Sequence, residues 1–180
     1  GDKWVLNGHK WLISVFPGHP YFYVTFANTE EGITSFGIEH GTPGLVLKPM
    51  EKMMGTVGPR HFNVIFQDLA VPEKNILGTK GKGLDVAFNI LGLSRVSIAA
   101  CCVGVAQKLL DLCLVHVKKR STFGKPLMTR QAIQWMLAEM GTDISAGRLL
   151  YQKAAWEYEQ GMDIDLDAAM AKLHTEEMVV

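Results

Sequence analysis

The sequence has no excess of charge of either sign and no long apolar run. Its 18 basic and 18 acidic side chains give a formal net charge of zero, so nothing favours nucleic acid or an anionic membrane as a partner. No apolar run approaches the roughly 20 residues that span a bilayer, and the start, Gly1 to Trp4, lacks the pattern of a signal peptide. We therefore expect a chain that is not secreted, has no membrane span, and binds small molecules or other proteins.

Cysteine is scarce, and its spacing argues against an internal disulfide. Cys101 and Cys102 are adjacent, and Cys113 lies roughly 18 Å further along what reads as one helix, whereas a disulfide needs Cα atoms within about 7 Å. We expect free thiols in a reducing compartment. No metal site is expected, because metal-ligand spacing is absent among the cysteines and the six histidines, His9, His19, His40, His61, His116 and His174.

What the sequence does contain, up to about residue 80, is the pattern of antiparallel strands. Short segments rich in aromatic and β-branched residues are separated by Gly, Pro and Asn. Asn7-Gly8 suits the positive φ angles of a tight turn, which predicts a β-hairpin from Trp4 to Ile13. Further strands are expected at residues 21–27, 34–39, 45–48 and 61–66, and in the last of them Phe62, Val64 and Phe66 alternate on one face. We predict that residues 1–80 form a β-domain, a sandwich or open barrel, that has lost its earlier strands.

A glycine-rich segment at residues 78–83 separates this region from a helical one. It lacks the Gly-Lys-Ser/Thr ending of a phosphate-binding loop, so we expect a flexible linker. Ser94 is a plausible helix start. The next helix shows the clearest three- and four-residue periodicity, and Gly161 ends it.

A third helix is expected to begin near Asp165 or Asp167 and has no stop signal before Val180. Too few helices are present to close a bundle. The predicted fold class is therefore α+β, with residues 81–180 as a truncated part of an up-down four-helix bundle.

The segment between the first two predicted helices admits two interpretations. The basic residues 118–120 complement the negative pole of a helix C-terminus, which makes a plain helix end. Arg120, Thr122, the aromatic Phe123 and a helix N-terminus near Gln131 also make a clamp for a phosphate and a ring. The residues alone leave both interpretations open.

Arg120 to Leu127, followed by Gln131, resemble the FAD-binding signature of acyl-CoA dehydrogenases. Asn7 to Ser14 resemble the hairpin of that family that lays the flavin ring against the β-domain. Further similar segments are residues 66–72, which end in Val-Pro, residues 94–95 and residues 134–140. The similarity extends across essentially all 180 residues.

The resemblance implies a fold of an N-terminal helical domain, a middle β-domain and a C-terminal four-helix bundle, usually in a homotetramer. This chain matches the later β-domain and the first part of the bundle. The resemblance places Ser94 and Arg95 near an acyl-CoA substrate. It also implies FAD-contacting residues, part of them acting on FAD bound mainly by a neighbouring subunit: Leu12, Ile13, Ser14, Arg120, Ser121, Thr122, Phe123, Arg130 and Gln131.

This chain departs from the family pattern at two places. The usual flavin-stacking Trp is replaced by Leu12, and Trp11, one position early, is expected on the opposite strand face. This argues against flavin packing through Trp11 and makes a buried sheet aromatic the alternative at that position. Residues 54–61 keep the Met-Gly of the family but not its usual Arg and Ser/Thr pattern, which indicates an atypical subgroup.

The resemblance implies α,β-dehydrogenation of an acyl-CoA thioester, with electron-transferring flavoprotein as partner and a cytoplasmic or mitochondrial-matrix location. Most family members place the catalytic Glu well downstream of the matched region, and a minority place it where this chain has Ser94. No catalytic residue is therefore assigned, and the chain alone is expected to be inactive. Three alternatives are a flavin oxidase or monooxygenase on this fold, a non-catalytic FAD- or CoA-binding subunit, and a helical interaction module.

Overall fold

The computed structural model describes residues 3–15, 22–51, 53–54 and 60–180. The chain divides into two compact units, Gly1–Ala87 and Phe88–Val180. The first unit contains antiparallel strands and the second contains helices, so the predicted α+β class is confirmed. His19, and residues 55–59 of the atypical stretch, lie outside the described residues.

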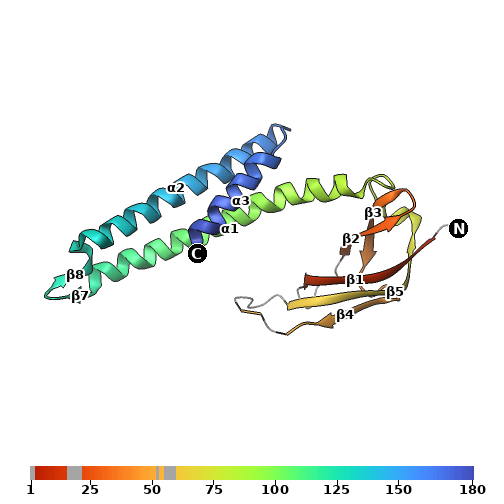
Figure 1. Ribbon diagram of the computed structural model, residues 1–180, viewed down its shortest axis with the longest axis horizontal. Helices are drawn as coiled ribbons and strands as arrows, with labels where there is room; N and C mark the ends of the chain where they lie inside the picture. The colour runs from red at the N-terminus through yellow and green to blue at the C-terminus, as the bar shows by residue number, and fades with distance from the viewer. Residues whose placement is uncertain (1–2, 16–21, 52, 55–59) are drawn as a thin grey trace. The chain divides into compact units, whose positions relative to one another are not determined.

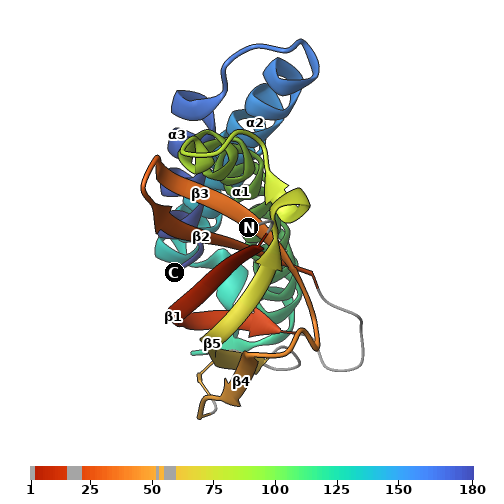
Figure 2. The ribbon, with the colours of Figure 1, turned by 90° about the vertical axis from the view of Figure 1, so that its right-hand side faces the viewer.

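The first sheet of the β unit has the strand order β1-β5-β4 (Figures 1 and 2). Here β5 (Arg60–Pro72) pairs antiparallel with both β1 (Lys3–Val15) and β4 (Leu45–Pro49). Side chains alternate between faces along a strand, and Val64 and Phe66 are buried as the sequence pattern predicts. The alternation thus identifies the core face of β5.

The second sheet has the order β2-β3-β6. A two-residue turn joins β2 (Phe22–Thr29) to β3 (Gly32–Glu39), and β6 (Ile76–Leu77) follows the short 3-10 helix η1 (Glu73–Asn75). Both sheets contribute to one apolar core, whose buried members are Leu6, Phe36, Ile38, Val64, Phe66, Leu69 and Val71.

Asn7-Gly8 lies inside β1 and forms no turn, so the predicted hairpin from Trp4 to Ile13 is wrong. Asn7 is instead held by a residue of β5. Its Nδ2 donates to Asp68 Oδ1 at 2.9 Å, and its Oδ1 accepts from the Asp68 amide at 2.8 Å. Asp68 has a φ of 46° where the register between β1 and β5 shifts, which is the geometry of a β-bulge. A cross-strand contact therefore satisfies the side chain that suggested a turn.

The glycine-rich segment 78–83 connects the sheets to the first helix and is anchored to the second sheet. The Gly81 amide donates to Thr34 Oγ1 at 2.9 Å. Lys80 Nζ lies 2.6 Å from Glu31 Oε1, and this hydrogen bond lowers the pKa of Glu31 from its usual value. These contacts fix the end of the β unit from which the first helix begins.

Three helices and a small ribbon follow. Their bounds are α1 (Gly83–Lys119), β7 (Ser121–Thr122), β8 (Lys125–Pro126), the 3-10 helix η2 (Leu127–Thr129), α2 (Gln131–Glu159) and α3 (Asp165–Val179). Figure 1 shows α1 and α2 on the same side of the ribbon that joins them, with opposite chain directions. Gly161, with a φ of 72°, follows the end of α2 as predicted.

The predicted helix start at Ser94 is wrong, because α1 begins eleven residues earlier, at Gly83. Ser94 lies inside the helix, where its Oγ donates to the Ile90 carbonyl at 2.9 Å. A serine can bond back to the carbonyl four residues earlier and so be accommodated within a helix. Its preference for helix starts was therefore misleading here.

Small residues bring α2 close to both other helices. A Cβ on Gly147 would lie 2.9 Å from Thr175 Cγ2 of α3 and 3.3 Å from Val103 Cγ2 of α1. Ile144, one turn before Gly147, is buried with Val103 and Ala106. Leu110, Tyr151, Met178 and Val179 pack around this cluster, so the helical core combines a close approach at Gly147 with larger side chains.

Helix α1 is long and apolar enough to cross a membrane by length and composition alone. Its most apolar 18-residue stretch is only 17% buried. Counting uninterrupted apolar residues missed this property, because polar residues such as Ser97, Gln107 and Asp111 break the runs while the average stays high. A membrane-spanning helix and a bundle helix with an exposed apolar face have similar compositions. Val103 and Ala106 contact α2, as expected of a bundle helix.

Candidate functional site

The β-unit part of the predicted site is built on a second bulge. Lys10 pairs with Val64 and Ile13 pairs with Phe62, so β1 carries one extra residue between these pairs. Leu12, in this bulge, has a φ of 58°. The bulge breaks the alternation of side chains along β1.

The bulge exposes two large apolar side chains, one aromatic and one aliphatic, in the described part of the chain. Trp11 is 64% exposed and Leu12 is 47% exposed. The expectation of a buried sheet aromatic at position 11 is therefore wrong, because strict alternation does not hold through a bulge. The structure offers both side chains as apolar surface beside Ile13 and Ser14.

Ser14 and Ile13 line a pocket of about 450 Å³ in the β unit. Ile13 also packs against the core, whereas Ser14 is exposed and its Oγ lies 3.4 Å from His61 Nε2. The aromatic side chains of Phe22 and Phe26 line the same pocket. A hydroxyl beside apolar walls is suited to a flat, partly polar ring.

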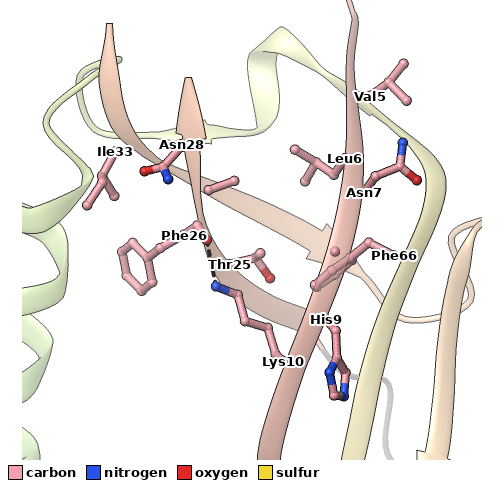
Figure 3. Close-up of a pocket in the computed structure, with 12 residues that line it drawn as sticks. Val5, Leu6, Asn7, His9, Lys10, Thr25, Phe26, Asn28, Ile33 and Phe66 are labelled. Atoms are coloured by element: carbon pink, nitrogen blue, oxygen red, sulfur yellow. Dashed lines mark hydrogen bonds between the residues drawn. The ribbon is translucent and has the colours of Figure 1, made fainter. Parts of the chain in front are cut away.

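Lys10 is a candidate site residue that the sequence analysis missed. It lines this pocket and also a second one of about 500 Å³ between β1 and β2. Figure 3 shows the side chain reaching from β1 to β2, where Nζ donates to the Phe26 carbonyl at 2.9 Å. The sequence around Lys10 does not predict this contact, because the acceptor is a backbone carbonyl on another strand.

The helical part of the predicted site is a tight hairpin between α1 and α2. Strands β7 and β8 pair through Ser121 with Pro126 and Thr122 with Lys125. The two turn residues between them both have positive φ, 49° at Phe123 and 75° at Gly124, as a type I′ hairpin turn requires. Phe123 is 96% exposed, so the turn presents a whole aromatic ring outward.

Two arginines flank this hairpin in different ways. The Arg120 side chain is exposed and makes no hydrogen bond, ion pair or ring contact with the described residues. Only its backbone is engaged, with the His116 carbonyl and the Leu127 amide. Arg130 Nη2 instead donates to the Thr122 carbonyl at 2.7 Å, and its guanidinium lies 5.8 Å from the centre of the Phe123 ring.

The N-terminus of α2 lies directly after this hairpin. Gln131 is its first residue, and no side chain caps the helix at Arg130. The unpaired backbone amides of a first turn favour anions, and Arg120 and Arg130 add positive charge on the same segment. Arg120, Ser121, Thr122, Phe123, Arg130 and Gln131 are therefore brought together on one short stretch of chain.

Ser94 and Arg95 lie far from that hairpin. Both are partly buried within α1. Arg95 and Lys119 stand 24 residues apart on the same helix, or about 36 Å at 1.5 Å per residue. The two predicted groups therefore cannot contact the same part of one bound molecule within the helical unit.

The cysteines and the potential metal ligands do not belong to either group of predicted site residues. All three cysteines are free, and burial raises the pKa of the Cys102 thiol. Within the described part of the chain no three His, Cys, Asp or Glu side chains gather where they could hold a metal ion.

Comparison with known proteins connects this chain to one family. Residues 81–180 match the family described as acyl-CoA dehydrogenase, C-terminal domain. Human mitochondrial short-chain specific acyl-CoA dehydrogenase is 37% identical, over 98% of this chain and 44% of its own length. Acryloyl-CoA reductase (NADH) of Anaerotignum propionicum is 36% identical, over 98% of this chain and 46% of its own length.

Solved structures show the same relationship. The structure of butyryl-CoA dehydrogenase from Megasphaera elsdenii is similar with a TM-score of 0.92 and 36% identity, over 98% of this chain and 47% of that chain. The chain thus spans slightly less than half the length of these relatives.

Proposed function

The chain belongs to the acyl-CoA dehydrogenase family, and from this membership we propose that the whole protein oxidises an acyl-CoA thioester at its α,β-bond with FAD. Residues 1–80 would form the later part of a middle β-domain and residues 81–180 the first part of the helical domain. The observation that carries this proposal is the hairpin at Phe123, which presents an exposed aromatic ring beside an unpaired arginine and an uncapped helix start.

The residues of the hairpin fit a dinucleotide cofactor. A diphosphate needs cationic and backbone N–H donors, and Arg120 and the first turn of α2 supply both. The Phe123 ring offers a stacking surface, and Ser121 and Thr122 add hydroxyl groups on the same ribbon. Gln131 brings a side-chain amide to the same helix start. We assign this cluster to the FAD of a neighbouring subunit.

The β unit fits the ring end of the cofactor. Leu12 and Ile13 would supply apolar contact to the flavin, and the Ser14 hydroxyl would donate a hydrogen bond to it. When bound, FAD would accept the hydride that leaves the β-carbon of the substrate. The exposure of Trp11 makes it a second apolar contact beside Leu12, which replaces the usual Trp of the family.

Arg95 and Ser94 are proposed to contact the acyl-CoA. Both residues lie inside α1 and not at a helix start. A carboxylate at position 94 would therefore not be stabilised by the positive end of the helix dipole. No residue of this chain is assigned as the base that removes the α-proton. We therefore expect the chain by itself to have no dehydrogenase activity.

The separation of the two groups in the helical unit supports a homo-oligomer, a dimer or tetramer. About 36 Å of helix separates Arg95 from the hairpin, so each would serve a different active site of the assembly. Electron-transferring flavoprotein is the electron acceptor that we propose, in a cytoplasmic or mitochondrial-matrix setting.

The similarity to acryloyl-CoA reductase favours a second candidate, in which the same site works in the reducing direction. The whole protein would then saturate an enoyl-CoA. Comparing kcat/KM for an enoyl-CoA with NADH and for an acyl-CoA with electron-transferring flavoprotein distinguishes the two candidates.

The proposal is tested by Arg120→Ala in the whole protein. Charge-assisted hydrogen bonds of about 1.5 to 3 kcal/mol would be lost, which corresponds to roughly ten- to over a hundredfold weaker FAD binding. Equilibrium titration of the apoprotein with FAD measures the effect. Lys118→Ala removes an exposed cation from the last turn of α1, outside the signature, and is the matched control, for which little change is expected. Equal FAD affinity in wild type and Arg120→Ala would mean that this segment is a plain helix end and does not bind FAD.

A further inference from the structure

Arg130 differs from Arg120 in that its guanidinium is already engaged inside its own chain. Nη2 donates to the Thr122 carbonyl at 2.7 Å, and the same group lies 5.8 Å from the centre of the Phe123 ring. Arg130 is only partly exposed, whereas Arg120 is exposed. The two arginines on this segment therefore have different surroundings.

The hairpin that Arg130 contacts needs support from outside itself. Each strand has two residues, and even much longer isolated hairpins are marginal in water. Phe123 adopts a φ of 49°, which is unfavourable for a residue with a Cβ. Its ring is 96% exposed, so packing against the protein core does not hold it.

Arg130 reaches both weak points of this hairpin. It bonds to the carbonyl immediately before the turn, and its planar group lies against the one large side chain of the turn. Because one N–H of Nη2 is used in this contact, one of the two paired edges of the guanidinium is occupied and cannot hold a phosphate through two parallel bonds. Arg130 also precedes α2 directly, so the contact links the turn to a rigid helix.

We propose that Arg130 is a positioning residue, which holds the Thr122–Phe123 turn in the conformation that presents the aromatic ring and Arg120, and that it does not itself bind the cofactor phosphates. This inference rests on the proposed FAD site and refines it. Arg120 is then the anion ligand of this segment, and Arg130 acts through the turn.

The test compares Arg130→Lys, Arg130→Gln and Arg120→Gln in the whole protein. A positioning role needs the planar group, so Lys and Gln at position 130 should both weaken FAD binding about three- to tenfold. The dependence of that binding on salt should stay as in wild type. Arg120→Gln should weaken binding more and should reduce the salt dependence, because a charge on the ligand contact is lost.

A second measurement does not depend on FAD. The Leu127 amide donates to the Arg120 carbonyl at 2.8 Å at the base of the hairpin, and its hydrogen exchange reports whether the hairpin is closed. Exchange in the apoprotein should rise several-fold in both Arg130 variants and should not change in Arg120→Gln. Phe123→Ala should remove most of the additional effect of Arg130→Lys on FAD binding, since both changes act on one contact.

The outcomes separate this inference from the proposed function. Full FAD affinity in Arg130→Lys, with reduced salt dependence in Arg130→Gln, would make Arg130 a phosphate ligand and overturn the positioning role. Unchanged exchange at Leu127 in both Arg130 variants would also overturn it. If Arg120→Gln leaves FAD binding unchanged while the Arg130 variants open the hairpin, the FAD assignment is wrong and the positioning role stands.

Discussion

The two units of this chain keep their apolar side chains in opposite places. In the β unit, large residues from both sheets are buried in one core, with Phe36 fully buried and Leu69 beside it. In the helical unit the fully buried residues are mostly small, and many large apolar side chains are exposed: Leu109, Leu112, Val115, Trp135, Met136, Leu149, Trp156, Leu166 and Leu173. The β unit thus contains its own main source of stability, whereas the helices present apolar surface that suits packing against further parts of an assembly.

The largest effect is expected from breaking the core of the β unit. Phe36→Ala removes a ring that is 0% exposed and lies 5.9 Å from the Trp4 ring. The free energy of unfolding should fall by about 3 to 5 kcal/mol. Denaturant unfolding of the chain followed by tryptophan fluorescence measures the loss.

The control for this prediction is Leu149→Ala in α2, where the side chain is 68% exposed. A change within about 0.5 kcal/mol is expected for the chain by itself. If both substitutions cost the same, the contrast between a filled core and an outward-facing apolar surface does not describe this molecule.

A smaller effect on stability is expected at Gly147, where α2 approaches its neighbouring helices closely. Gly147→Ala places a Cβ 2.9 Å from Thr175 Cγ2, and the crowding should cost about 1 to 3 kcal/mol, less the gain in helix propensity. Gly141→Ala lies two turns earlier on α2, where the added Cβ meets nothing within 4 Å. That substitution should stabilise the chain by about 0.5 to 1 kcal/mol.

Thermal unfolding of the two glycine variants should therefore shift in opposite directions. Stabilisation by both substitutions would mean that α2 can move away from Val103 and Thr175 at no cost. In that case the close approach of the helices is incidental to their stability.

The sequence predicted features that depend on neighbours along the chain. The two-residue alternation identified the buried face of β5 at Val64 and Phe66, and Gly161 identified the end of α2. Both signals are local, because a strand pleat and a left-handed helix end are set by a few adjacent residues. The residues gathered at the Phe123 hairpin were also close in sequence.

Features that depend on distant partners were predicted wrongly or missed. Asn7 has turn chemistry, but Asp68 satisfies its side chain from another strand. Trp11 was expected to be buried because strict alternation was assumed along β1. The bulge that breaks this alternation depends on the pairing of two strands and cannot be recognised from the sequence of one strand. The bond between Lys10 and the Phe26 carbonyl had no sequence signal at all.

The smallest effect concerns the ionic contact between α2 and α3. Lys153 Nζ lies 2.7 Å from Asp167 Oδ1 and 3.3 Å from Glu157 Oε1. The hydrogen bond from Lys153 lowers the pKa of Asp167 from its usual value of 3.8, and the bond to Asp167 raises the pKa of Lys153 from 10.5. Surface ion pairs contribute little in general, so only a modest pH dependence is expected.

The sign of that dependence follows from the two shifts. Asp167 has a lower pKa in the folded chain than in the unfolded one, so its contribution is present above about pH 4 and is lost as the pH falls through the folded value. Lys153 has a higher folded pKa, so its contribution is present below about pH 10 and is lost as the pH rises through the folded value. Asp167→Asn should flatten the acid side of a plot of melting temperature against pH and leave the region from pH 5 to about pH 8 almost parallel to wild type.

Lys153→Met offers a sharper version of this test, because it also acts on Glu157. Glu157 is 7% exposed, and its Oε2 has no hydrogen-bond partner among the described residues, whereas its Oε1 lies 3.3 Å from the Lys153 ammonium. Removing that cation leaves a buried carboxylate unpaired, and Lys153→Met should therefore destabilise the chain more than Asp167→Asn at neutral pH. Equal melting temperatures for the two variants at pH 7 would show that Glu157 gains nothing from Lys153.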